Sequence, residues 1–159
     1  MERTLAGSCT RLTCDQCTSC RLWSVTIIEV AGNWELGWAA PITEIEHWGM
    51  AMRSFNVERL TMFPVTGIQC KFLDEYETVE EVLASKPHLT TVFVDENGET
   101  ELKDFEHPED ALYVFGKANY TPFPTYGQDD LSVRIDCDLM GMLWPHQAMS
   151  IVLYDRASK

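Results

Sequence analysis

Short runs of apolar residues without polar alternation most constrain how this chain can fold. The run Ala111-Leu112-Tyr113-Val114-Phe115 is apolar at every position, so a strand there would be buried on both faces. Its length favours a strand over a helix. Segments predicted as strands are residues 23–30, 57–65, 90–98, 107–116 and 131–135. Strands buried on both faces are typical of a parallel sheet covered by helices, so the sequence predicts an α/β fold.

The segments between these strands carry the signals of helices. Thr43, with Glu46 three residues later, predicts a capping box at the start of a helix that ends at about Ser54. A short acidic helix is predicted over residues 78–85, and a final apolar helix over residues 143–156. The expected architecture is therefore a parallel sheet of about five strands flanked by helices.

Length and composition indicate one globular domain. The chain has 159 residues, of which 45% are hydrophobic, enough to close a core. We place the domain at residues 23–159, after a cysteine-containing leader at residues 1–22. No apolar run is long enough to span a membrane, and the N-terminus lacks the apolar core of a signal peptide, so a cytoplasmic location without membrane contact is expected.

The charge of the chain is strongly negative and unevenly distributed. The formal net charge is -13, and residues 71–110 hold thirteen of the 25 acidic residues but only three basic ones. Binding to RNA phosphates draws on clustered Lys and Arg, so the net charge disfavours RNA binding by charge alone. The acidic segment is expected to form a solvated face that keeps the protein soluble, with a binding role as the alternative.

Four of the six cysteines are clustered in the leader. The sequence CTRLTCDQCTSC places them at Cys9, Cys14, Cys17 and Cys20. The C-x2-C spacing is half of a zinc or iron–sulfur site, which makes these thiolates candidate metal ligands. The overlap of the repeats would require a very tight loop, and the alternative is a leader with free thiols.

Ligands of open α/β sheets bind beyond the carboxyl ends of the strands. The loops at these ends are predicted at residues 31–41, 95–98, 116–127 and 136–142. His146 lies next to the last of these loops and is a candidate site residue. The other three histidines are expected to be structural residues with satisfied hydrogen bonds. The chain has no P-loop, G-x-G-x-x-G, G-x-S-x-G or H-E-x-x-H motif, so the binding and catalytic sites that these motifs form are excluded.

Two C-terminal segments resemble a known family. HPEDALYVFG at residues 107–116, followed by LSVRI and MLWPHQAMSIVLYDR, is similar to motifs of the SPOUT superfamily of RNA methyltransferases, in its ribose 2'-O-methylating branch. NVERLTMFP at residues 56–64 resembles the family's first conserved region more weakly. The likeness extends from about Trp23 to Arg156 and leaves the leader outside.

The resemblance implies a parallel α/β sheet with a C-terminal trefoil knot, a homodimer, and S-adenosylmethionine bound in the knot mainly by backbone atoms. The positions that the resemblance assigns to the cofactor are Val94, Phe115, Gly116, Ile135, Met140 and Leu143.

The polar residues of the family motifs are replaced in this chain. Glu44 and Met50 stand where the family has an Asn and a catalytic Arg, and Trp144 stands where it has a second Asn. Arg53, one helical turn after Met50, and His146 are therefore the candidate catalytic residues. The function predicted is that of a divergent S-adenosylmethionine-dependent RNA methyltransferase. The alternatives are an inactive SPOUT-like dimer that acts as a binding or assembly module, and a regulatory protein that binds metal through its leader cysteines.

Overall fold

The computed structural model describes residues 26–35, 40–116, 129–137 and 143–159. The four leader cysteines and Met140 lie outside these residues. The segments that the predicted knot would involve also lie partly outside them, so the knot, like the division at residues 22 and 23, stays a prediction.

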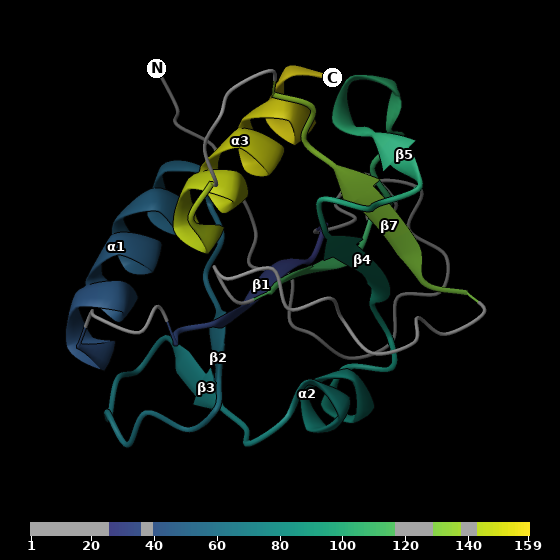
Figure 1. The fold of residues 1–159 in the computed structure, drawn as a ribbon. Helices are drawn as coiled ribbons and strands as arrows, with labels where there is room; N and C mark the ends of the chain where they lie inside the picture. Colours follow the sequence, from purple (N-terminus) through teal and green to yellow (C-terminus); the bar gives the residue numbers. More distant parts are fainter. Residues whose placement is uncertain (1–25, 36–39, 117–128, 138–142) are drawn as a thin grey trace, which may run out of the picture.

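A single parallel sheet forms the centre of the fold (Figure 1). Its strands follow the order β3-β2-β1-β6-β4-β7-β5. The strands are β1 (Ile28–Asn33), β2 (Leu60–Phe63), β3 (Leu73–Glu75), β4 (Thr90–Val94), β5 (Thr100–Glu101), β6 (Ala111–Phe115) and β7 (Leu131–Arg134). The predicted α/β class and parallel sheet are confirmed.

The prediction of about five strands was too low, because the described residues form seven. The two additional strands, β3 and β5, have three and two residues and lie at the two edges of the sheet. Runs this short carry no readable alternation of polar and apolar residues. All five residues of the central strand β6 are buried, as its two-sided apolar sequence predicts.

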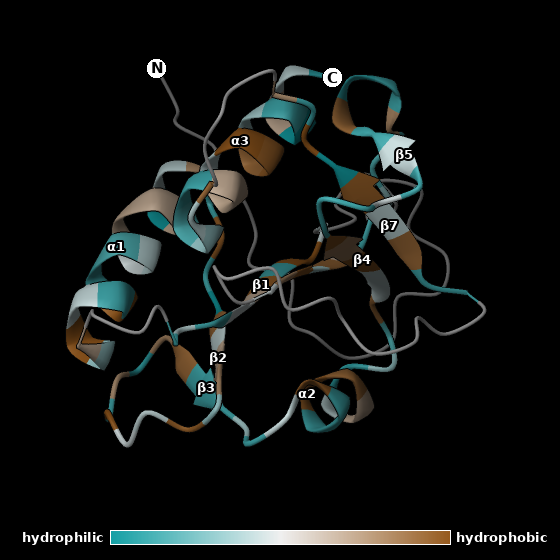
Figure 2. Cartoon of the chain, viewed as in Figure 1, coloured by the Kyte–Doolittle hydropathy of each residue, from teal (hydrophilic) through white to brown (hydrophobic). Residues whose placement is uncertain are grey.

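The helices cover the two faces of the sheet unequally. Helices α1 (Pro41–Ser54) and α3 (Pro145–Ser158) pack on each other and on the same face. The short helix α2 (Val79–Ser85) covers the other face, against a smaller cluster that contains Phe93 and Val114. Figure 2 shows hydrophilic and hydrophobic residues mixed along α1, as expected of a helix with one buried side.

The ends of the helices depart slightly from the prediction. Thr43 does not cap α1, because the helix begins at Pro41 with Ala40 as its N-cap. Proline suits the first turn, where its missing N–H and fixed φ carry no cost. The predicted short acidic helix is confirmed as α2, and the Thr78 hydroxyl caps it by accepting a hydrogen bond from the backbone N–H of Glu81. Helix α3 lies two residues later than predicted at both ends.

The two C-terminal motifs meet in a buried network. His107 Nδ1 lies 2.6 Å from the Tyr113 hydroxyl, and His107 Nε2 lies 2.9 Å from the Asp155 carboxylate. Arg156 donates to the same hydroxyl and to the Pro108 carbonyl oxygen. Burial lowers the pKa of His107 and raises the pKa of Tyr113, which favours the neutral form of both groups. The network fixes the C-terminal end of α3 at the start of β6 and confirms His107 as a structural histidine.

A close contact between Gly32 and Trp48 sets the position of α1 on the sheet. A Cβ atom at Gly32 would lie 2.3 Å from Cη2 of Trp48, and the indole is completely buried. The sequence Ala31-Gly32-Asn33 was expected to close the first strand, but β1 continues through it. Glycine is suited to this position because another group approaches the backbone closely.

None of the helices among the described residues is both long and apolar enough to cross a membrane.

The Gly32–Trp48 contact leads to a stability prediction. We expect Gly32→Ala to lower the free energy of unfolding by about 1–3 kcal/mol, because the added methyl group overpacks the core. Urea denaturation measures this change. The double variant Gly32→Ala/Trp48→Leu is the control, since the cost of the alanine should shrink when the indole is absent. An equal cost in both backgrounds would contradict the assignment.

Candidate functional site

The predicted cofactor positions lie at the carboxyl ends of three neighbouring strands. Val94 ends β4, Phe115 ends β6, and Ile135 directly follows β7. Strand β4 lies between the other two, and Val94 is paired with Phe115 on one side and with Val133 on the other. The edge formed by the ends of β6, β4 and β7 is called here the carboxyl edge.

The remaining cofactor positions follow the same geometry. Gly116 comes directly after β6, and Leu143 lies two residues before α3. Val94, Ile135 and Leu143 are partly buried and pack against the larger core cluster. Five of the six positions therefore lie among the described residues, and all five lie at the end of a strand, directly after it, or just before the start of α3.

The carboxyl edge is also where α1 and α3 begin. Each helix follows a strand, and their C-terminal ends lie at the opposite edge, where α1 leads into β2 and Arg156 contacts Pro108 before β6. The first turns of both helices consequently face one another.

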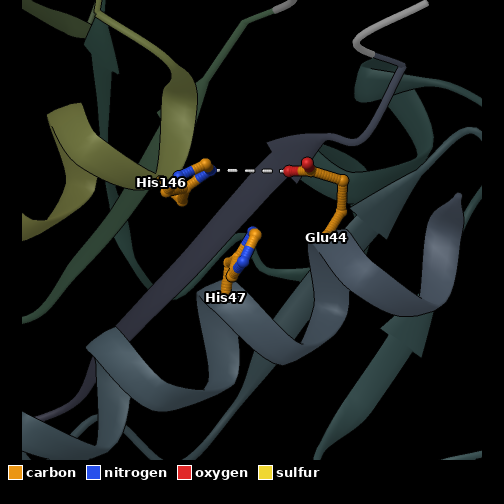
Figure 3. A group of neighbouring side chains, drawn as sticks. All are labelled: Glu44, His47 and His146. Atoms are coloured by element: carbon orange, nitrogen blue, oxygen red, sulfur yellow. Dashed lines mark ion pairs between the residues drawn. The ribbon is translucent and has the colours of Figure 1, made fainter. Parts of the chain in front are cut away.

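Three polar side chains from the first two turns of α1 and the first turn of α3 form a cluster, shown in Figure 3. Glu44 and His47 come from α1, and His146 is the second residue of α3. His146 Nδ1 lies 3.5 Å from Glu44 Oε2, and the centroids of the two imidazole rings are 5.0 Å apart. One ligand atom from each side chain lies within 4.8 Å of the others.

The cluster is buried and its hydrogen bonding is incomplete. Glu44 is 1% exposed, and both histidines are half-buried. Glu44 Oε2, His47 Nδ1 and His146 Nδ1 are buried atoms without a hydrogen-bond partner. At 3.5 Å, the contact between Glu44 and His146 is too long for a well-formed hydrogen bond. Buried polar groups normally have partners, so a concentration of unpaired atoms in one place points to a missing ligand.

Burial lowers the pKa of His146, and the Glu44 carboxylate opposes this shift while His47 adds to it. The net direction is downward, so the imidazole is predominantly neutral at pH 7. A neutral imidazole offers a nitrogen lone pair that can accept a proton or bind a metal ion.

The two candidate catalytic residues are not brought together. Arg53 lies in the last turn of α1, six residues after His47 and about 9 Å further along the helix axis. Its guanidinium lies over the ring of Phe72, 5.1 Å from the centroid, just before the start of β3. Arg53 is thus at the opposite end of α1 from His146, and its catalytic role stays a prediction.

The expectation that His47 is a satisfied structural histidine was wrong, because its buried Nδ1 has no hydrogen-bond partner. Glu44 was noted only as a replacement for the family's Asn, and its proximity to the histidines was missed. The sequence held a local signal, since Glu44-Ile45-Glu46-His47 is an E-x-x-H pattern that places both side chains on one face of a helix.

No protein-family model matches the sequence, and no curated protein sequence matches it. The structure is nevertheless similar to solved methyltransferases. The SpoU methyltransferase AviRb from Streptomyces viridochromogenes, solved in complex with the cofactor AdoMet, matches with a TM-score of 0.63 and 12% identity over 84% of this chain and 57% of that chain. The chain has the fold of these methyltransferases.

Two further matches agree. A protein whose structure concerns the 2-OH methylation of C/U34 on tRNA matches with a TM-score of 0.59 and 12% identity, over 83% of this chain and 95% of that chain. An AdoMet-bound rRNA methyltransferase from Sinorhizobium meliloti matches with a TM-score of 0.61 and 11% identity, over 83% of this chain and 56% of that chain. The resemblance predicted from the sequence is confirmed for this methyltransferase fold.

Proposed function

We propose that this chain is an S-adenosylmethionine-dependent RNA methyltransferase of the ribose 2'-O type. The observation that carries the proposal is the carboxyl edge, where the described cofactor positions lie at or just after the ends of three adjacent strands, or just before α3, in a fold shared with methyltransferases. In open α/β sheets, ligands bind at this edge. An RNA substrate also fits the cytoplasmic location expected from the sequence.

The described residues fit S-adenosylmethionine. Val94, Ile135 and Leu143 offer half-buried apolar surface, as pockets for ring-containing ligands usually do. Gly116 adds backbone without a side chain directly after β6, where main-chain groups are no longer used in the ladder. These residues would hold the cofactor, which supplies an electrophilic methyl group on a sulfonium centre.

The chain itself must act on the substrate hydroxyl. A ribose hydroxyl is a weak acid, so it has to be polarised or deprotonated and held in line with the methyl group. His146 lies three residues after Leu143, at the N-terminal end of α3, and faces the buried Glu44. We assign His146 to the hydroxyl and Glu44 to the positioning of the imidazole.

Charge limits how RNA would reach this site. Arg134, at the end of β7, forms ion pairs with Glu101 and Asp136 and donates to the Gly98 and Glu99 carbonyl oxygens. A guanidinium engaged in this way is a poor phosphate ligand. We therefore propose that a second protomer or another protein supplies part of the positive charge that holds the RNA.

A homodimer is part of the proposal. The outer faces of the two packed helices expose large apolar residues, which are Ile42 and Met50 on α1 and Ile151 and Tyr154 on α3. Exposed apolar residues that cluster on neighbouring elements are typical of interfaces.

Sedimentation equilibrium tests the dimer. We expect twice the chain mass for the wild type and a dissociation constant raised about 100-fold by Met50→Glu/Tyr154→Glu, because like charges would meet across the interface. Val65→Glu, at an exposed apolar position outside these helices, is the control. A wild-type monomer at all concentrations would contradict the proposal.

Calorimetry tests cofactor binding. We expect the wild type to bind S-adenosylmethionine and its demethylated product, and Ile135→Asp to weaken both about tenfold or more, because a carboxylate would be desolvated beside the ligand. Leu131→Asp is the matched control, since Leu131 is exposed at the other end of β7. An equal loss of affinity in both variants would show that S-adenosylmethionine does not bind beside Ile135.

Methyl transfer to total RNA tests the activity. We expect His146→Gln to lower the rate about 100-fold, within the range for loss of a group that transfers a proton. Arg53→Ala tests the other candidate, whose side chain packs at the far end of α1, and an unchanged rate in this variant would remove Arg53 from its predicted catalytic role. Full activity in His146→Gln would contradict the role of His146 at the substrate hydroxyl. A wild-type protein that binds the cofactor but transfers no methyl group would be a binding module and not an enzyme.

A further inference from the structure

We propose that Glu44, His47 and His146 bind one divalent transition-metal ion of the Zn²⁺ class. Two imidazoles and one carboxylate converge from the first two turns of α1 and the first turn of α3 (Figure 3). This donor set occurs at zinc sites with three protein ligands and at mononuclear iron(II) sites. Mg²⁺ and Ca²⁺ prefer oxygen ligands, so two imidazoles argue against them.

The unpaired atoms of the cluster support a ligand at its centre. Glu44 is nine-tenths buried or more, and one of its oxygens has no hydrogen-bond partner. The Nδ1 atom of each histidine is likewise buried and has no hydrogen-bond partner. A cation would satisfy one carboxylate oxygen and two ring nitrogens at once. Within the described part of the chain, Glu44 forms no ion pair with Lys or Arg.

The distances require only a small contraction. Ligand atoms around a tetrahedral Zn²⁺, with bonds of about 2.0–2.2 Å, lie roughly 3.3–3.6 Å from one another. The Glu44–His146 pair is already at 3.5 Å, and no separation in the cluster exceeds 4.8 Å. Rotation about side-chain torsions can bring the ligand atoms to the separation that Zn²⁺ requires, because Glu44 and His47 are one turn apart on the same helix.

The role of the ion rests on the proposed function, whereas its binding does not. Three protein ligands leave a fourth position open, as in catalytic zinc sites. With the ion bound, the substrate hydroxyl would bind at this position and lose its proton to water. The ion would then act on the hydroxyl in place of the free His146 imidazole, and His146 would serve as a metal ligand. The oxygen of the hydroxyl would then form a bond to the methyl carbon while the carbon–sulfur bond of the sulfonium breaks, leaving the thioether product. A metal ion would thus supply the positive charge that the resemblance assigns to an Arg, a residue that is replaced by Met50 in this chain.

Cobalt(II) absorption tests the binding directly. The full-length chain is prepared with Cys9, Cys14, Cys17 and Cys20 changed to Ser, because thiolates in the leader would compete for the metal. After chelation and removal of the chelator, we expect one equivalent of Co²⁺ to give visible d–d bands without a sulfur charge-transfer band, and Zn²⁺ to displace it.

Matched variants locate the site. His47→Gln and Glu44→Gln should each weaken Co²⁺ binding about 100-fold or more, at least as much as loss of an outer-shell partner does. His88→Gln and Glu46→Gln are the controls, because both residues are exposed and outside the cluster. Equal binding by the variants and the controls, or no binding by the parent protein, would overturn the proposal.

Thermal unfolding distinguishes the loss of the metal site from a general folding defect. Zn²⁺ should raise the unfolding temperature of the parent protein and leave that of Glu44→Gln unchanged, since ligands that bind only the folded state stabilise it. Without metal, Glu44→Gln should be at least as stable as the parent, because the amide removes a buried charge. An equal zinc-induced shift in both proteins would contradict the site. Calorimetry with S-adenosylmethionine on the same samples separates a failure of the metal site from a failure of the proposed function.

Discussion

The contact of Trp48 with the backbone of Gly32 determines how the rest of the site is arranged. The indole is completely buried, also meets Phe115 edge to face at 5.5 Å, and requires the bare backbone of β1 beneath it. Because Trp48 faces the sheet, the rotation of α1 about its axis is fixed. His47 is the residue before Trp48, and Glu44 is one turn earlier, so this rotation turns both toward α3. A larger residue at Gly32 would displace α1 and with it two members of the cluster.

Helix α3 is held at its far end by a different interaction. The hydrogen bonds among His107, Tyr113 and Asp155, joined by Arg156, link the two motifs whose sequences resemble the methyltransferase family. These residues lie at the start of β6 and the end of α3, away from the carboxyl edge. Their contribution is structural: they place the first turn of α3, with His146, beside the strand ends. The polar groups that carry chemistry in this account are at the other end of the same helix.

The sequence predicted the α/β class, the parallel sheet and five of its strands, because apolar runs such as residues 111–115 can be buried only in a covered sheet. It did not predict β3 and β5, whose few residues carry no pattern. It identified His146 as a candidate, since position next to a strand-end loop can be read from the chain. The grouping of His146 with Glu44 and His47 could not be read in the same way, because it depends on the packing of two helices separated by about a hundred residues. Only the E-x-x-H half of the cluster was visible locally.

The central claim is that a methyl donor binds at the carboxyl edge beside the first turns of α1 and α3. The most direct test is nuclear magnetic resonance with S-adenosylmethionine carrying a carbon-13-labelled methyl group. The account predicts cross-relaxation from this methyl group to the imidazole protons of His146 and to the side chain of Leu143 in the bound state. Tight binding with cross-relaxation only to residues away from this edge, or no binding at high protein concentration, would contradict it.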